Sequence, residues 1–433
     1  TEKVERLILK FSIPAIISML VSSLYNIVDR IYIGHIPGIG ASALTGVGLF
    51  APILMLLNAF AMLVGSGGAP RAAIAMGKKD HDTAEKIVGN CFTLLTGLAV
   101  ILTILFYISA PTLLKLFGAS SATMSYATAY ARIYILGSFF VLIVLGMNPF
   151  ITTQGFAKIS MMTTVIGAVI NIILDPVFIF VLGMGVRGAA LATVLSQAVG
   201  AIWILRFLTG KKTILRLTKE NMRLEVRVFG PCLALGISTF VMLSTESLLS
   251  ISFTNSLSRY GGDVAVGAMT ILTSTMQFAM LPLQGIGQGA QPIMSYNYGA
   301  RNIDRMKKTF KLHLVISLIY STLFWLFVQL FPATFAGIFS SDPELVSFTA
   351  GALRIYCGAM FLFGIQLACQ MTFVAIGYAV CSIIVAVVRK FVLLLPLIFI
   401  VPMFVSNKTL GVYMADRICY RSDIHGDFVL NPI

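Results

Sequence analysis

The segment GSGGAPRAAIAMGKKDHDTAEK at residues 65–86 returns in outline as GQGAQPIMSYNYGARNIDRMKK at residues 287–308. Six residues of the first copy recur at an offset of 222 positions, namely Gly65, Gly67, Pro70, Gly77, Asp82 and Lys86. The same offset relates Phe117, Arg132, Tyr134, Phe139, Gly155, Ala157 and Ser160 to Phe339, Arg354, Tyr356, Phe361, Gly377, Ala379 and Ser382. The chain is therefore a duplicated unit. In an apolar chain, two matched halves are typical of transporters whose substrate site lies between them.

The composition predicts an all-α integral membrane protein. Of 433 residues, 58% are hydrophobic and 11% are charged, and the mean hydropathy is +0.93. This leaves too little polar surface for a soluble fold of this size. A membrane helix needs about 20 apolar residues to cross roughly 30 Å of hydrocarbon. Such stretches lie at 7–33, 41–64, 87–109, 129–151, 160–182, 186–208, 226–254, 265–292, 310–331, 350–372 and 382–404, which makes eleven spans.

The repeat predicts a twelfth span and two six-helix bundles. We assign residues 1–210 to an N-terminal bundle, 211–224 to a basic linker and 225–433 to a C-terminal bundle. The tail carries Asp416, Arg417, Arg421, Asp423, His425 and Asp427, which enter lipid only at a large solvation cost. We therefore interpret residues 416–433 as a truncated or altered last helix, in preference to a genuine surface segment. The chain does not begin with Met, and we expect its N-terminus to be incomplete as well.

The positive charges predict an orientation in the membrane. The net charge is +14, and 19 of the 31 Lys and Arg residues lie before the first span or in and beside alternate loops, at 71–86, 158, 206–227 and 301–311. The opposite loops hold only Lys115, Arg187, Arg259 and Lys408. This asymmetry places the N-terminus and the basic linker in the cytoplasm. A nucleic-acid partner is disfavoured, because membrane spans separate the basic loops.

No motif indicates an enzyme. The six cysteines show no CxxC spacing, and no HExxH, GxxxxGK[ST] or GxSxG pattern stands on a suitable element. We therefore expect no cofactor, and without a nucleotide-binding loop uphill transport needs an ion gradient.

Three acidic residues fall inside confident spans: Asp29, Asp175 and Glu246. An unpaired carboxylate in lipid costs several kcal/mol, so each is a candidate for function. Asp29 and Asp175 lie roughly 25–33 Å from the cytoplasmic boundary at 1.5 Å per residue, and Thr193 lies at a similar depth. Asn171 is four residues before Asp175, hence on the same helix face.

Together these side chains, with carbonyls freed by Pro176, offer hard oxygen ligands that could hold Na⁺ or share protons. The alternative is structural: Asp175 would cap a helix or pair with a neighbour such as Arg187, and Asp29 would pair with Arg30 at the outer surface.

The second half is chemically unequal to the first. Glu246 matches Asp29 when both are counted from Pro14 and Pro231, but residues 393–398 read LLLPLI where the Asn171 and Asp175 pair would recur. We therefore expect ion coupling in the first half. Glu246 could attract a cationic substrate, or it could be hydrogen-bonded inside the bundle.

The segments IPAIISMLVSSLYNIVDRIYIG at 13–34 and NIILDPVFIF at 171–180, together with the repeated motif, resemble the multidrug and toxic compound extrusion (MATE) transporters over about residues 1–415. The resemblance implies two six-helix bundles related by a pseudo-twofold axis about the membrane normal, in the cytoplasmic membrane of a bacterium or archaeon. It implies alternating-access antiport that exports amphipathic, often cationic, organic compounds against entering Na⁺ or H⁺.

In the similar bacterial and archaeal branch, the first bundle binds the coupling cation. Its ion-site positions fall on Asp29, Asn171, Asp175 and Thr193, and a bend in the first helix falls on Pro14. The other prokaryotic branch uses an acid that Glu246 matches. That branch's further acid finds only Gln366, Cys369 or Gln370 here.

A soft, polarizable cavity for flat aromatic cations is our expectation for substrate binding. Its candidate residues, besides Glu246, are Met55, Met269, Met276, Met280, Gln154 and Gln284. The alternative is that these Met side chains fill packing gaps or face lipid.

Two other functions remain open. A flippase for a lipid-linked sugar would need cations in its cavity, and the spans offer few beyond Arg132, Arg354, Arg389 and Lys390. A non-transporting scaffold or sensor would not need paired intramembrane oxygens. We expect a monomer whose partners are organic small molecules and the bilayer.

Overall fold

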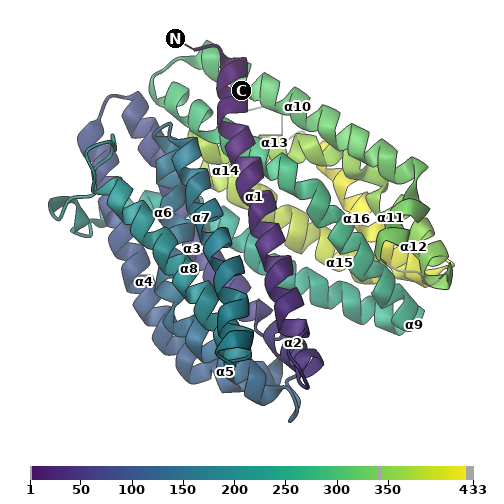
Figure 1. Ribbon diagram of the computed structural model, residues 1–433. Helices are drawn as coiled ribbons and strands as arrows, with labels where there is room; N and C mark the ends of the chain where they lie inside the picture. Colours follow the sequence, from purple (N-terminus) through teal and green to yellow (C-terminus); the bar gives the residue numbers. More distant parts are fainter. Residues whose placement is uncertain (1, 340–342, 426–433) are drawn as a thin grey trace. The chain divides into compact units, whose positions relative to one another are not determined.

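The computed structural model describes residues 2–339 and 343–425, and over these ranges the chain forms helices and no strands (Figure 1). In the first half the helices are α1 (Val4–Gly34), α2 (Gly40–Gly48), α3 (Ala51–Gly77), α4 (His81–Leu116), α5 (Met124–Leu136), α6 (Ser138–Thr153), α7 (Ala157–Pro176), the π-helix η1 (Val177–Val181) and α8 (Val186–Leu208). In the second half they are α9 (Val226–Gly299), α10 (Ile303–Leu330), α11 (Pro332–Phe339), α12 (Pro343–Tyr356), η3 (Cys357–Leu362), α13 (Phe363–Ile376), α14 (Ala379–Val387), the π-helix η4 (Val388–Leu394), α15 (Leu395–Phe404) and α16 (Lys408–His425).

The predicted all-α membrane fold is confirmed. Among the described residues, eight helices are long and apolar enough to cross a membrane, and a ninth span results if α5 and α6, bent by 55°, are one. The predicted spans 226–254 and 265–292 both lie within α9. This element consists of two helices that meet at a kink at Gly262, whose φ of 61° and ψ of -156° are not helical and are adopted by glycine without strain.

Contacts group the chain into two units. The first residues of α1 belong to the unit formed mainly by the second half, and the first residues of α9 belong to the unit formed mainly by the first half. One unit, here called the N-terminal unit, comprises Ile13–Leu243 and Ser295–Asn302. The other, the C-terminal unit, comprises Thr1–Ser12, Ser244–Met294 and Ile303–Ile433. The units therefore do not coincide with the predicted halves 1–210 and 225–433.

Two repeated glycines explain this arrangement. A Cβ on Gly67 of α3 would overlap the carbonyl oxygen of Cys232, so the start of α9 packs directly on the N-terminal unit. A Cβ on Gly289, its repeat counterpart, would overlap Ser12, so the start of α1 packs on the C-terminal unit. Close approach of helix backbones at small residues is the usual basis of membrane helix packing.

The two copies of the repeated motif lie at the ends of α3 and α9, and these two helix ends pack against each other inside the N-terminal unit. A Cβ on Gly77 at the end of α3 would overlap the carbonyl oxygen of Tyr296, and a Cβ on Gly299 at the end of α9 would overlap that of Ile74. Gly77 and Gly299, like Ile74 and Tyr296, are 222 positions apart. The two copies of the motif therefore contact each other through equivalent backbone atoms.

The turn after α3 is fixed by local chemistry. Lys79 has a positive φ of 62°, as does its repeat counterpart Arg301 at 56°. Asp80 then caps α4, because its Oδ1 accepts a hydrogen bond from the Thr83 N–H at 3.0 Å. Hydrogen bonds from Thr83 hold the pKa of the Asp80 carboxyl below its ordinary value.

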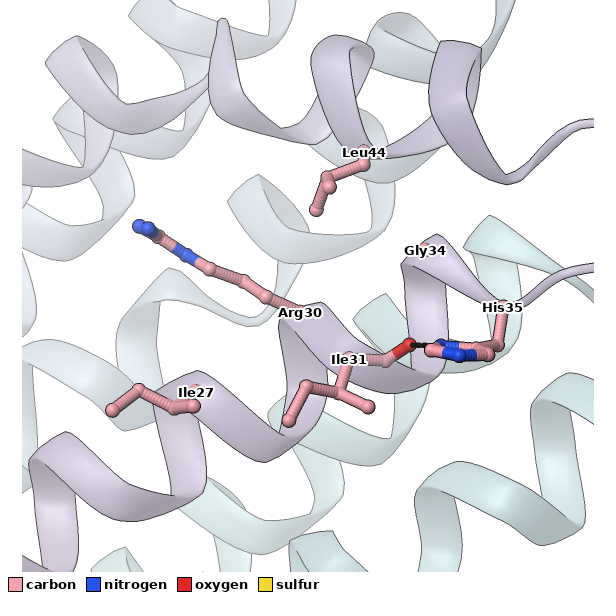
Figure 2. A pocket seen from close by; sticks show the side chains of 6 residues that line it. All are labelled: Ile27, Arg30, Ile31, Gly34, His35 and Leu44. Carbon is pink, nitrogen blue, oxygen red and sulfur yellow. Dashed lines mark hydrogen bonds between the residues drawn. The ribbon is translucent and has the colours of Figure 1, made fainter. Parts of the chain in front are cut away.

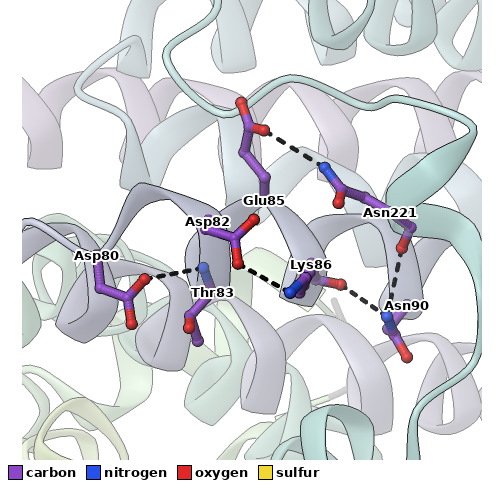
Figure 3. A network of polar contacts seen from close by, with 7 residues as sticks. All are labelled: Asp80, Asp82, Thr83, Glu85, Lys86, Asn90 and Asn221. Carbon is purple, nitrogen blue, oxygen red and sulfur yellow. Dashed lines mark hydrogen bonds and ion pairs between the residues drawn. The ribbon is translucent and has the colours of Figure 1, made fainter.

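Hydrogen bonds attach the linker at 211–224 to α4 of the N-terminal unit (Figure 3). Asn90 of α4 accepts from the Glu225 N–H at 2.7 Å and donates to the carbonyl oxygens of Lys86 and Asn221. Glu85 accepts from the Arg216 N–H at 3.0 Å and from the Asn221 side chain at 3.3 Å.

Replacing Asn90 by Ala is expected to loosen this linker. The lost hydrogen bonds contribute about 1 kcal/mol, so trypsin should cut the linker about fivefold faster in detergent. Asp82→Ala, which removes an exposed partner of Lys86 on the same helix, should leave the cleavage rate unchanged. Equal rates in the two variants would contradict an anchoring role for Asn90.

The described part of the tail is helical. α16 continues through Asp416 to His425 as a helix, and Val412, Tyr413, Ala415 and Cys419 are buried in the core of the C-terminal unit. The Tyr413 hydroxyl donates to the carbonyl oxygen of Ala265 at 2.7 Å. Asp416 is itself buried, so its carboxylate lies inside the unit and not against lipid. Residues 426–433 lie outside the described residues.

Candidate functional site

Three helices of the N-terminal unit bring the four predicted ion-site residues together. α1 supplies Asp29, α7 supplies Asn171 and Asp175, and α8 supplies Thr193, and all four are buried. Asn171 Nδ2 donates to Asp175 Oδ1 at 3.3 Å and to Thr193 Oγ1 at 3.4 Å. Asp29 and Asp175 lie close enough to each other to interact electrostatically. The four predicted residues therefore lie near one another.

This site has a surplus of acceptors. Asp29 Oδ1, Asn171 Oδ1 and Asp175 Oδ2 are buried and have no hydrogen-bond partner in the structure. A buried acceptor without a partner costs roughly 1–3 kcal/mol, and more when it is charged. Three such oxygens on α1 and α7 would be satisfied by a cation or a proton. No group of three or more His, Cys, Asp or Glu side chains suited to a metal occurs in the described ranges.

Aromatic hydroxyls adjoin the acids, a feature that the sequence reasoning missed. Tyr130 lies on α5, which packs against α8, and it is near Thr193. Tyr134, one turn further, stacks on Tyr130 with ring centroids 5.9 Å apart. Tyr25 of α1 lies close enough to Asp29 to interact electrostatically. The spacing of Tyr130 and Tyr134 by four residues was a signal that they share a helix face.

The structural alternatives for the two acids rest on arginines. Within the described residues, neither Asp29 nor Asp175 forms an ion pair within 4.0 Å with Arg30 or Arg187, although Arg30 lies close enough to Asp29 to interact electrostatically. Arg30 also lines a shallow pocket with Ile27, Ile31, Gly34, His35 and Leu44 (Figure 2). Its side chain extends away from His35, whose Nδ1 lies 2.8 Å from the carbonyl oxygen of Ile31. The polar groups of this pocket do not converge, so we do not assign it a function.

Pro14 lies inside α1 and beside the point where the helix passes from one unit to the other. Ser12 belongs to the C-terminal unit and Ile13 to the N-terminal unit. Proline removes the hydrogen bond to the carbonyl four residues earlier, so the helix is weakest at this point.

Glu246 is already paired. Its Oε1 accepts a hydrogen bond from the ammonium of Lys390 in η4, and the two side chains form an ion pair. The Glu246 side chain is 55% exposed, while that of Lys390 is 4% exposed. The contact agrees with the hydrogen bond of the second sequence interpretation, because Lys390 neutralises the charge of Glu246.

Several predicted cavity residues have packing or anchoring roles. Gln154 Oε1 accepts from Thr213 and from the N–H groups of Ile214 and Leu215, so it anchors the linker. The three Met side chains of α9 lie in or against apolar clusters of the C-terminal unit: Met269, Met276 and Met280. Met55 is 45% exposed and Gln284 is partly buried.

The fold and this site define a multi-pass helical membrane protein with paired carboxylates buried among its helices. The MatE family model matches residues 14–177 and 238–400, and the chain belongs to this family.

Known proteins similar to this chain agree with that family. One is the multidrug export protein MepA of Staphylococcus haemolyticus, 26% identical over 82% of this chain and 78% of the relative. Another is the probable multidrug resistance protein YoeA of Bacillus subtilis, 23% identical over 93% of this chain and 88% of the relative. A crystal structure of a MATE protein in the bent conformation has a TM-score of 0.91 and 25% identity, covering 97% of this chain and 93% of that one.

Proposed function

We propose that the protein is a cation-coupled multidrug efflux antiporter that exports amphipathic organic compounds by alternating access. Membership of the MatE family and the relatives named for multidrug export support export of drugs. The observation that carries cation coupling is the trio of buried, unpartnered oxygens on Asp29, Asn171 and Asp175.

The donor set suits either coupling ion. Carboxylate, amide and hydroxyl oxygens are the hard ligands that Na⁺ takes, and Asp29, Asn171, Asp175 and Thr193 would supply them. Two adjacent carboxyls are equally suited to share an incoming proton, because each disfavours ionisation of the other.

Coupling requires a difference in affinity between two conformations. An ion that bound the inward and outward states equally would shift nothing. α1 carries Asp29 near its end and Pro14 near its start. Neutralising Asp29 changes the balance of forces on this helix, and Pro14 is the point where it bends most easily. Bending of α1 on ion binding is therefore the proposed link to drug release.

Transport in proteoliposomes tests this function. Purified protein should drive ethidium out of the compartment that corresponds to the cytoplasm when a Na⁺ or an H⁺ gradient is imposed separately. The gradient that supports efflux identifies the ion. No efflux under either gradient, with folded protein in the membrane, would refute the antiport proposal.

The proposed orientation places the N-terminus and the basic linker in the cytoplasm of a bacterial or archaeal cell. Lys212 in the linker and Lys307 in α10 are both exposed on the structure, so cysteines placed there are open to reagents. In intact cells Lys212→Cys and Lys307→Cys should resist a membrane-impermeant maleimide and react after permeabilisation. Labelling of both in intact cells would reverse the orientation.

A further inference from the structure

In each half of the chain the last helix packs against the helix before it through equivalent residues. These contacts define which residue of α8 corresponds to which residue of α16. A Cβ on Gly188 would lie 2.7 Å from the carbonyl carbon of Phe178, and one on Gly411 would lie 3.5 Å from that of Val401. Gly188 and Gly411 are 223 positions apart, and so are Phe178 and Val401. The buried residues Val186, Gly188, Ala189, Ala190, Ala192, Thr193 and Ser196 likewise correspond to Thr409, Gly411, Val412, Tyr413, Ala415, Asp416 and Cys419.

The offset exceeds that of the motif by one residue, and the added residue falls between Ser382 and Val401, the segment that contains η4. A π-helix holds about one more residue per turn than an α-helix. The π-helix of the first half, η1, begins only after Asp175.

This alignment of the two halves identifies the residues of the C-terminal unit that correspond to the predicted ion site. Asn171, Asp175 and Thr193 correspond to Leu394, Ile398 and Asp416, while Asp29 corresponds to Glu246. Two oxygen ligands have become apolar, but the counterpart keeps two acids.

Lys390 lies one turn before Leu394, and its ammonium group lies near Glu246 and Asp416. Its side chain is 4% exposed, and its ammonium is paired with Glu246, whose own side chain is 55% exposed. Asp416 is buried and close enough to act on the same ammonium electrostatically. The neighbouring Arg389 places its guanidinium 5.6 Å from the ring centre of Phe363.

We propose that Lys390 is the fixed cation of a second, repeat-related ion site, so that the C-terminal unit takes up no mobile cation. The N-terminal unit then performs ion coupling alone, an inference that rests on the proposed antiport. A mobile cation would have to expel an ammonium that is tethered beside Glu246 and therefore present at a high effective concentration. The expelled ammonium would remain buried, which is costly for an unpaired charge.

Removing the tethered charge should open the second site. Lys390→Met keeps an unbranched apolar side chain but leaves Glu246 and Asp416 without the ammonium. Purified variant should bind roughly twice as much radioactive Na⁺ as the wild type, or take up additional protons on a pH indicator. Lys308→Met removes the exposed partner of Glu5 and should change neither. Unchanged Na⁺ binding and proton uptake in folded Lys390→Met protein would overturn the proposal.

A free amine should replace the lost side chain. Lys390→Ala should lower the melting temperature in detergent, and millimolar propylammonium should restore part of the loss. Tetramethylammonium, which donates no hydrogen bond, should not. The same amine should leave Lys308→Ala unaffected. Absence of any selective effect of propylammonium on Lys390→Ala would contradict a cation site at this position, and this arm applies even if Lys390→Met does not fold.

An Asp175→Asn background separates this inference from the proposed function. If coupling lies in the N-terminal unit, Asp175→Asn abolishes the cation binding of the parent protein, and adding Lys390→Met restores binding at the other unit. Adding Glu246→Gln as well should remove the restored binding. Should Asp175→Asn leave parental binding intact, the coupling proposal fails, while the increment produced by Lys390→Met still decides the role of Lys390.

Discussion

Asp175→Asn is expected to abolish gradient-driven efflux while drug binding at equilibrium stays near the wild-type level. The buried Oδ2 of Asp175 has no donor partner in the structure. An amide in its place carries no charge and accepts no proton at physiological pH. Losing a charge partner for a desolvated cation costs several kcal/mol, so ion affinity should fall by about a thousandfold or more. Efflux from proteoliposomes and fluorescence titration with ethidium measure the two effects.

Asp82→Asn provides the matched control. Asp82 is exposed and pairs with Lys86 at 2.8 Å across one turn of α4, far in sequence from the acids of α1 and α7. The same chemical change there should alter neither efflux nor binding, because exposed ion pairs contribute little. Native efflux by Asp175→Asn under both gradients would show that the first-unit site is not the coupling site, and coupling would then have to involve the acids of the C-terminal unit.

The ion-site residues could be predicted because their chemistry is rare in lipid. A carboxylate in an apolar span stands out in sequence, and a spacing of four placed Asn171 and Asp175 on one helix face. The structure brings both together with Asp29 and Thr193. Long apolar runs likewise predicted most helices, since a bilayer fixes their length.

Features that depend on tertiary contact could not be predicted in this way. Tyr130 is an ordinary residue in an apolar stretch until α5 packs beside α8. Lys390 lies inside a predicted span, but only the register change in η4 and its contact with Glu246 reveal its partner. The junction between the predicted spans 226–254 and 265–292 is a sharp kink at the single residue Gly262, whose non-helical backbone angles separate two helices.

Gly77→Ala is expected to destabilise the protein severely. The new methyl group would overlap the carbonyl oxygen of Tyr296 and lie 2.8 Å from the N–H nitrogen of Ala300. Both obstacles are backbone atoms, so no side-chain rotation relieves the overlap, and α3 and α9 would have to separate. Overpacking a close contact costs about 1–3 kcal/mol or more. We expect a lower melting temperature in detergent and aggregation on size-exclusion chromatography, and the same for Gly299→Ala, which meets Ile74 in the reciprocal position.

Gly97→Ala is the control that isolates the crossing from any general effect of adding a methyl group to a glycine. Gly97 lies inside α4, and no atom lies within 4 Å of the place that an added methyl group would take. Alanine also favours the helix by about 1 kcal/mol over glycine. The melting temperature of this variant should equal or exceed that of the wild type. If Gly77→Ala and Gly299→Ala were as stable as Gly97→Ala, the reciprocal contact of the two motif copies would not hold the N-terminal unit together. A loss in both, and not in Gly97→Ala, would tie the duplicated motif to helix packing, because only glycine is small enough for two backbones to meet there.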